Sequence, residues 1–289
     1  MLIFSFSPFG YEGALVTVEV DLRRGIPAVD IVGLADGAVK ESRERMQAAI
    51  RNSGFEFPNE RVLISLSPAD LKKEGAGFDL PIALSVILSN VPKSVSEKFI
   101  TDAVLVMGEL ELSGKVRSIK GVHAAISTAI ANGITRCIVP SGNLDEALEV
   151  EGALVYGANS LADAFSALSD VNVFKEKKLD VKNKDDVEFA DLGNAYRFED
   201  IKGQFKLVRG LQIAAAGGHN VLALGAPGCG KTMAMQKFPG INPLLSMDES
   251  QSVTRIWSLA GLIKPNEPLI RVPPFRMPHQ TATIEGICG

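Results

Sequence analysis

The chemistry that this sequence can perform centres on eight consecutive residues, Gly225-Ala226-Pro227-Gly228-Cys229-Gly230-Lys231-Thr232. They fit the pattern G-x-x-x-x-G-K-[ST], whose glycines let backbone N–H groups turn inward around phosphate oxygens. Lys231 would reach the β- and γ-phosphates of a nucleotide, and the Thr232 hydroxyl would coordinate Mg²⁺. Cys229 stands where many such loops carry Ser or Thr, and we interpret it as a small residue that fills the loop. The pattern therefore predicts a site for ATP and Mg²⁺.

The residues on either side supply the elements that such a loop requires. The apolar run 220–225, NVLALG, predicts a buried strand, and GKTMAMQKF at 230–238 predicts a helix that Pro239 ends. Residues 204–218, QFKLVRGLQIAAAGG, predict a further helix that ends at a glycine pair. A chance match to the loop pattern is the alternative, and the strand–loop–helix order argues against it.

Hydrolysis of a bound nucleotide also requires an acidic residue at the end of a second strand. The pair Asp248-Glu249 follows apolar residues and is a candidate for that position. However, Ser246 and Glu249 have the spacing of a capping box, with Ser at the N-cap and Glu at the third helical position. We interpret the pair as the start of a helix. Since no other apolar run before Gly289 ends in an acidic pair, we assign no catalytic residue.

The first part of the chain mixes predicted strands and helices. Alternating or β-branched runs predict strands at 13–22, 27–34, 61–68 and 136–140, and a hairpin through Ser113-Gly114. Apolar periodicity predicts helices at 36–54, 80–88 and 120–133. Together they predict an α+β domain over residues 1–173. Residues 174–190 are crowded with alternating charge and predict a solvated linker, which leaves 191–289 as a second domain.

Composition narrows the class of protein. The formal net charge is −4, which argues against a protein that coats nucleic acid with basic residues. The first 20 residues lack the basic and apolar segments of a signal peptide, and no apolar run is long enough to cross a membrane. The three cysteines, Cys137, Cys229 and Cys288, are far apart and form no metal or disulfide pattern. We expect a cytoplasmic protein.

Three longer stretches resemble one family, the AAA+ ATPases of the ComM/YifB type, which are also described as magnesium-chelatase-like. They are FEDIKGQFKLVRGLQIAAAGGHNVLALGAPGCGKTM, SMDESQSVTRIWSLAGL and PPFRMPHQTATIEGICG. The resemblance implies that the segment holding Ile201, Gly203 and Gln204 lies beside the adenine. Members of the family continue beyond the position of Gly289 to a Walker B segment, sensor residues, an arginine finger and a helical lid. The chain therefore resembles a C-terminally shortened member with a partial AAA+ domain.

The first half is similar to the Lon-protease-type domain at the front of these proteins, a fold like domain 2 of ribosomal protein S5. The similar residues are VMGELELSGKVRSIKGVHAAISTAIANGITRCIVP and SPADLKKEGAGFDLPIAL. The sequence departs from the protease at both catalytic positions. The loop from Glu74 to Leu80 contains no serine, and Gly121 is followed by Val122 and His123 rather than by lysine. We expect a domain that is not proteolytic.

The resemblance implies a homohexameric, ATP-driven motor that acts on DNA during recombination of incoming DNA, with no membrane partner. A nucleotide-binding or regulatory module without hydrolysis is the alternative. A Ser–Lys peptidase is a third hypothesis, because Ser65, Ser67, Lys72 and Lys73 lie near the Lon-like segment. Metal insertion into a tetrapyrrole ranks last, since the histidines are isolated from one another in the sequence: His123, His219 and His279.

Overall fold

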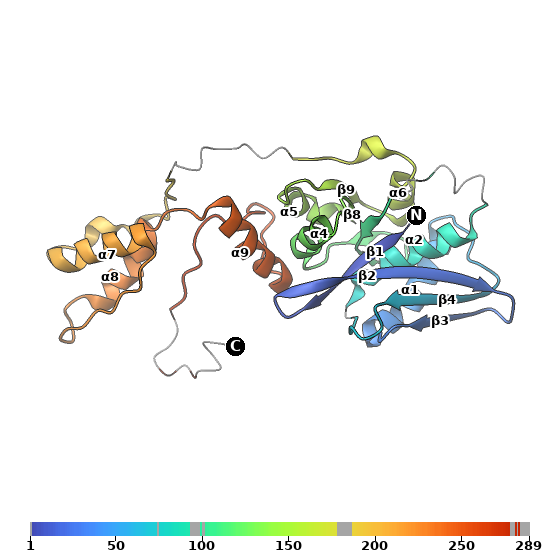
Figure 1. The fold of residues 1–289 in the computed structure, drawn as a ribbon, viewed down its shortest axis with the longest axis horizontal. Helices are drawn as coiled ribbons and strands as arrows, with labels where there is room; N and C mark the ends of the chain where they lie inside the picture. The colour runs from blue at the N-terminus through green and yellow to red at the C-terminus, as the bar shows by residue number, and fades with distance from the viewer. Residues whose placement is uncertain are drawn as a thin grey trace. The chain divides into compact units, whose positions relative to one another are not determined.

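The protein is described here from a computed structural model (Figure 1). The structure describes residues 2–73, 75–92, 99, 102–177, 187–277, 281 and 283. The chain divides into two compact units: residues 1–180 and 251–269 form the first, and residues 181–250 and 270–289 form the second. The sequence alone places every residue from 191 onward in the second domain, whereas this division counts Gln251–Leu269 with the first unit. Glu74, His279 and Cys288 lie outside the described residues.

A seven-stranded sheet in the order β3-β4-β2-β1-β5-β8-β9 forms the centre of the first unit. Four of the six strand pairings in this sheet are parallel, and the pairs β1–β2 and β2–β4 are antiparallel. The strands are β1 Ile3–Phe9, β2 Glu12–Arg23, β3 Ala28–Val32, β4 Arg61–Ser67, β5 Val104–Val106, β8 Arg136–Pro140 and β9 Leu154–Ala158. The first unit is thus a mixed α/β structure whose central sheet is mostly parallel.

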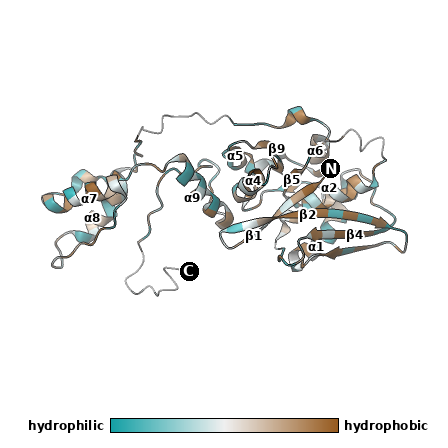
Figure 2. Cartoon of the chain, in the orientation of Figure 1, coloured by the Kyte–Doolittle hydropathy of each residue, from teal (hydrophilic) through white to brown (hydrophobic). Residues whose placement is uncertain are grey.

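Helices cover both faces of this sheet, and the strand sequences show why. In β5, Val104 and Val106 belong to one buried apolar cluster and Leu105 to the other, because successive side chains of a strand point to opposite faces. The helices that share the first cluster are α1 Gly37–Asn52, α2 Asp79–Asn90 and α6 Leu161–Ala167. The second cluster includes α4 Val122–Ala131 and α5 Leu144–Leu148. Figure 2 shows apolar segments on strands of this sheet and on the helices beside it.

Local signals explain several element boundaries that the sequence predicts. Asp36 accepts a hydrogen bond from the Val39 amide (2.8 Å) and caps the start of α1. Gly114 has a positive φ of 84° in the hairpin that joins β6 Glu109–Leu110 to β7 Val116–Arg117. Gly133, with a φ of 79°, follows the end of α4. The predicted strands, the hairpin and the helices of the first half are confirmed.

A buried carboxylate joins three elements of the first unit. The Asp79 side chain, at the start of α2, is fully buried. It accepts hydrogen bonds from the Ser42 hydroxyl and from Arg45 Nε (2.8 Å), both on α1, and from the Leu110 amide on β6 (3.1 Å). This carboxylate also raises the pKa of Arg45. One side chain therefore ties α1, α2 and β6 together.

The second unit has a smaller core. Ile201, Leu211 and Ala234 form its buried apolar cluster. Its helices are α7 Phe205–Gly217 and α8 Lys231–Lys237, and helix α9, Met247–Ala260, begins in this unit and ends among residues counted with the first. Short 3₁₀ helices complete the described elements of the chain: Ala76–Phe78, Ser141–Asn143, Val171–Val173, Asn194–Tyr196, Phe198–Asp200 and Phe238–Ile241.

The prediction of a buried strand at 220–225 is wrong for this structure. These residues form no strand, and Leu222 and Leu224 are 84% and 86% exposed. A strand needs neighbours that satisfy its backbone N–H and C=O groups. Within the described residues of the second unit there is no strand to pair with. The apolar run therefore stays on the surface of this unit.

Candidate nucleotide-binding site

The loop Gly225–Thr232 adopts backbone conformations that favour glycine. Gly228 has a φ of 77° and Gly230 a φ of 88°, both in the left-handed region that other residues rarely adopt. Gly230 directly precedes α8, so Lys231 is the first residue of that helix. A Cβ atom at Gly225 would lie 3.1 Å from Cys229 Sγ. The glycines thus permit the tight turn that brings both ends of the loop together.

The Lys231 amine lies at the centre of this turn. Its Nζ donates to the carbonyl oxygens of Gly225 (2.7 Å) and Ala226 (2.8 Å), and it lies 3.5 Å from Cys229 Sγ. An ammonium group has three donors and no acceptor, so these partners use its hydrogen-bonding capacity within the loop. The Cys229 side chain is half-buried and fills the loop as the sequence interpretation expects. Thr232 is exposed in the first turn of α8.

The segment Ile201–Gln204, which the family resemblance places beside the adenine, contacts the loop Gly225–Thr232 through the side chain of Gln204. Gln204, which precedes α7 in a left-handed conformation (φ 50°), donates from Nε2 to the Cys229 carbonyl at 3.3 Å. Gly203 also has a positive φ, of 67°. By contrast, Ile201 packs in the core of the second unit. Sequence reasoning did not anticipate the Gln204–Cys229 contact, because the two residues are 25 positions apart and no local pattern links them.

An ion pair in the second unit holds the same segment against α8. Lys237 Nζ lies 2.8 Å from Oδ2 of Asp200, the residue that precedes Ile201 in the chain. The hydrogen bond from Lys237 lowers the pKa of Asp200. The last turn of α8 is therefore tied to the residues that lead into α7.

Glu249 performs the structural role that the capping-box interpretation predicts. Its Oε2 accepts from the Ser246 amide (2.9 Å) and hydroxyl (2.9 Å), while the Ser246 Oγ accepts from the Glu249 amide (3.3 Å). These bonds from Ser246 lower the pKa of Glu249. The start of a helix at this point is confirmed, and the Glu249 carboxylate is engaged in the cap.

Ser65, Ser67 and Lys73, three of the residues named for a Ser–Lys peptidase, make structural contacts. Ser65 and Ser67 are half-buried on β4 and pair with Glu19 and Thr17 of β2. Lys73 is fully buried and donates to the main-chain carbonyl of the residue after Ser67, Pro68. Burial lowers the pKa of Lys73.

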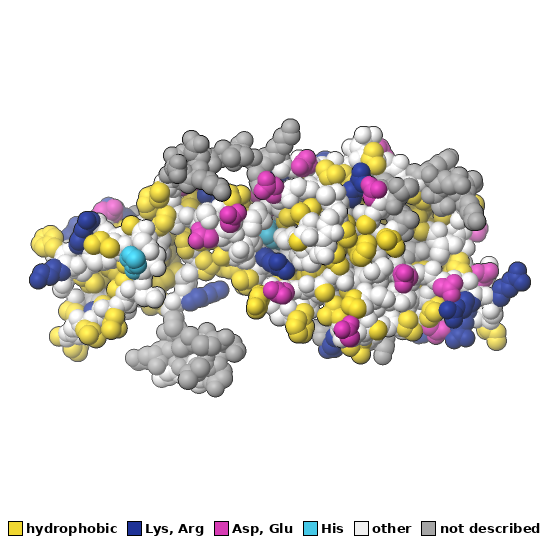
Figure 3. All heavy atoms as spheres, in the orientation of Figure 1, with side chains coloured by type: hydrophobic (Ala, Val, Ile, Leu, Met, Phe, Trp, Pro, Cys, Tyr) yellow, Lys and Arg dark blue, Asp and Glu magenta, His cyan; other side chains and the backbone are white. Residues whose placement is uncertain are grey.

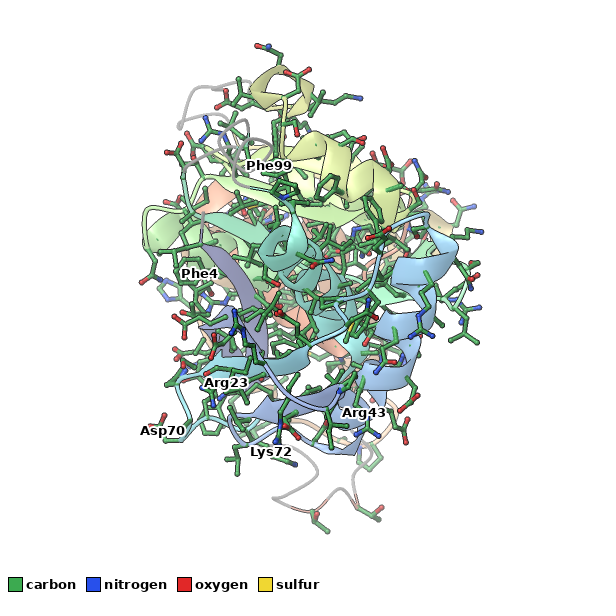
Figure 4. The ribbon with its side chains drawn as sticks, turned by 90° about the vertical axis from the view of Figure 1, so that its right-hand side faces the viewer. Phe4, Arg23, Arg43, Asp70, Lys72 and Phe99 are labelled. Carbon is green, nitrogen blue, oxygen red and sulfur yellow. The ribbon has the colours of Figure 1, made fainter. Side chains whose placement is uncertain are left out.

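The exposed end of the first unit near these residues carries charges of both signs. Figure 4 shows Lys72, Arg23 and Arg43 at the same end as Asp70. Arg23 pairs with Asp21 at 2.6 Å, and Arg43 pairs with Glu44 at 3.1 Å. Figure 3 likewise shows basic and acidic side chains interspersed on the visible face of the first unit. The described residues visible on this face therefore present mixed charges, rather than a uniformly positive surface, to a phosphate backbone.

His123 is packed rather than poised for catalysis. It is fully buried on α4, and its Nε2 lies 2.8 Å from Gln251 Oε1 on α9, within the first unit. Its amide donates to Glu146 Oε1 (3.1 Å) and to the Ser258 hydroxyl (3.2 Å). Burial, with a smaller contribution from Arg255, lowers its pKa to about 4. His123 is therefore a packed histidine in the first unit.

This burial predicts a pH-dependent loss of stability. The unfolded chain protonates His123 near pH 6.5 and the folded chain near pH 4, so acidification between these values favours unfolding. We expect His123 to remove roughly 3 kcal/mol of unfolding free energy over that interval. Denaturant titrations of wild type and His123→Gln from pH 7 to 4.5 measure the difference. His219→Gln is the control and should follow wild type; parallel curves for all three proteins would contradict the prediction.

The described residues contain neither a membrane-spanning helix nor a metal-binding cluster. No helix among the described residues is long and apolar enough to cross a membrane. Nor do the described residues bring three His, Cys, Asp or Glu side chains together as a metal centre would require. The Cys137 thiol is buried, which raises its pKa, and it is free.

Comparison with protein families defines the class. Residues 18–143 match the family described as subunit ChlI of Mg-chelatase, and residues 197–289 match magnesium chelatase, subunit ChlI. The chain is therefore magnesium-chelatase-like and related to the AAA+ ATPases.

Individual relatives identify the family within this class. An uncharacterized protein of Mycobacterium tuberculosis is 37% identical over 99% of this chain and 55% of its own length. YifB of Escherichia coli is 34% identical over 100% of this chain and 54% of its own. The competence protein ComM of Haemophilus influenzae is 32% identical over 100% and 55%. The chain belongs to the ComM/YifB family, and it spans about 55% of the length of these relatives.

Proposed function

We propose that this chain binds ATP with Mg²⁺ through the loop Gly225–Thr232. The observation that carries the proposal is the loop itself, in which Gly228 and Gly230 are left-handed and the Lys231 amine donates to the Gly225 and Ala226 carbonyls. A nucleotide phosphate would replace the two loop carbonyls as the partner of that amine, and charge-assisted hydrogen bonds to an anion are the stronger ones. Thr232, exposed at the next position, would hold Mg²⁺, which supplies charge neutralisation to the phosphates when bound.

Gln204 has a supporting role in this proposal. Its bond to the Cys229 carbonyl would link the adenine-side segment, with Ile201 and Gly203, to the phosphate loop. Ile201 would contribute through the core behind that segment rather than through direct contact with a base. The adenine base and the phosphates of ATP would then contact two segments of the second unit that this hydrogen bond joins.

The family resemblance also supports a proposal for the domain organisation of the chain. Residues 1–173 would form a Lon-protease-like domain of the ribosomal-protein-S5-domain-2 type without proteolytic activity. Residues 174–190 would be a linker, and 191–289 would be part of an AAA+ domain. Support for a non-proteolytic first domain is that the Lys73 amine donates to the main-chain carbonyl of Pro68.

We further propose that the longer proteins of this family are cytoplasmic hexamers that use ATP to move DNA during recombination. Support for this part is the membership of the family, to which a competence protein belongs, and not a charged surface on this chain. A second candidate is a module that binds ATP without hydrolysing it. That candidate is favoured by the Glu249 carboxylate, which serves the helix cap rather than an ion.

Calorimetric titration of ATP into the chain, with and without Mg²⁺, tests the proposal. We expect saturable binding that Mg²⁺ strengthens, because the Thr232 hydroxyl contributes only when the ion is present. Thr232→Val should remove the effect of Mg²⁺ while retaining binding of ATP alone, and Thr135→Val, an exposed threonine in the first unit, should behave as wild type. Absence of any binding to wild type would overturn the proposal.

Phosphate release from the same samples separates the two candidates. Release that follows the binding curve and disappears with Lys231→Met would support an ATPase. Saturable binding without release would support the binding module.

A further inference from the structure

A cavity lies entirely within the first unit, separate from the loop Gly225–Thr232. It measures about 280 Å³ and is lined by residues from segments 118–120, 142–146 and 258–268. This volume is slightly below the range of pockets that hold drug-sized ligands, so its occupant would be a small molecule. The three segments are distant in sequence, and sequence analysis gave no indication of the cavity.

The polar floor of the cavity is held by hydrogen bonds. Glu146 accepts from the Ser258 hydroxyl, from the His123 amide (3.1 Å) and from Asn143 Nδ2 (3.2 Å). Asn143 also accepts from the Ile119 amide (3.0 Å) and donates to the Ile119 carbonyl (2.9 Å). Because these groups satisfy one another, the Glu146 carboxylate is not a free charge for a ligand. The same bonds hold the cavity in a preformed shape.

Two opposite charges on the lining remain available. Among the described residues, neither Lys120 nor Asp145 forms an ion pair or a side-chain hydrogen bond, with each other or with a neighbour. The methylene stem of Lys120 lies against Gly261, where an added Cβ would be 2.6 Å from Lys120 Cδ. Similarly, the Ser118 hydroxyl lies against Gly142, where a Cβ would be 2.3 Å from Oγ. The glycines let these polar side chains lie close to the backbone.

The lining also contains Lys264, which pairs with Glu267 at 3.9 Å, and the apolar side chains Ile119, Ile263, Pro265 and Pro268. A ligand that carried only a negative charge would leave Asp145 facing it, and one that carried only a positive charge would leave Lys120 facing it. A small zwitterion with an apolar body satisfies both charges and the apolar wall. We propose that this cavity binds a free α-amino acid with an aliphatic side chain, its carboxylate on Lys120 and its ammonium on Asp145.

Three probes of one shape test the charge requirement. Protein-observed NMR titrations would use L-leucine, 4-methylpentanoate, which lacks the ammonium, and 3-methylbutylamine, which lacks the carboxylate. We expect leucine to bind about tenfold or more tightly than either analogue, since each lost charged hydrogen bond weakens binding by that order. Equal affinity for all three, or no saturation by leucine within its solubility, would overturn the proposal.

Matched variants assign the binding to this cavity. Lys120→Met keeps the stem that lies against Gly261 and removes the charge, and Asp145→Asn keeps the shape of the carboxylate. Each should weaken leucine binding about tenfold while thermal unfolding stays that of wild type, because both side chains lack partners in the described structure. Lys175→Met and Glu151→Gln, exposed positions away from the cavity lining, are the controls. Leucine affinity that is unchanged in both cavity variants would show that leucine binds elsewhere and would contradict the assignment.

Discussion

Replacing Lys231 with methionine is expected to weaken Mg·ATP binding about 100-fold or more. Methionine keeps the length and the apolar stem of lysine and removes only the ammonium group. The ammonium is the group that the loop surrounds, at 2.7 and 2.8 Å from two of its carbonyl oxygens. Its loss removes the charge-assisted hydrogen bonds that the amine would donate to phosphate. Calorimetric titration of Mg·ATP measures the effect.

Lys206→Met is the matched control for this experiment. Lys206 is exposed on α7 in the same unit and is outside the loop, so its replacement changes net charge by the same amount. It should leave the affinity within about twofold of wild type, because screened surface charges contribute little at ordinary ionic strength. The Lys231→Arg variant should also bind Mg·ATP weakly, since a planar guanidinium does not reproduce the compact ammonium group of lysine. If Lys231→Met bound Mg·ATP as wild type does, the loop would not be the site.

Replacing Asp79 with alanine is expected to lower the unfolding free energy of the first unit by about 3–5 kcal/mol. The substitution removes a fully buried carboxylate and leaves three donors without it: the Ser42 hydroxyl, Arg45 and the Leu110 amide. A buried donor without an acceptor destabilises the folded state by its full desolvation free energy, because no hydrogen bond offsets the loss of water. Urea denaturation followed by circular dichroism measures the change.

Asp21→Ala is the control, because Asp21 also pairs with an arginine but in an exposed position. The Asp21 and Arg23 side chains are both 59% exposed, and such surface pairs contribute about 1 kcal/mol or less. A loss of similar size in the two variants would contradict the role given to the Asp79 network. Asp79→Asn should fall between wild type and Asp79→Ala, because the amide keeps one acceptor and loses the charge that Arg45 meets.

Predictions from sequence succeeded where the information is local. The capping box of Ser246 and Glu249, the Asp36 cap of α1 and the glycine of the 113–114 turn each depend on residues a few positions apart. The eight-residue phosphate loop is equally local, and its glycine conformations agree with the pattern. Short-range hydrogen bonds and steric limits on φ decide such features, so a window of sequence contains their causes.

The sequence by itself determined the family, the positions of the helix caps and the glycine-dependent turn of the loop Gly225–Thr232. Tertiary structure decided which residues meet across long separations, such as Glu146 with Ser258, 112 positions apart, and the cavity that they help to form. It also decided that Leu222 and Leu224 stay exposed, although their pattern favours a buried strand. The physical reason is that a strand or a pocket is formed with residues from elsewhere in the chain. The apolar periodicity of one segment does not specify which distant residues pack or pair with it.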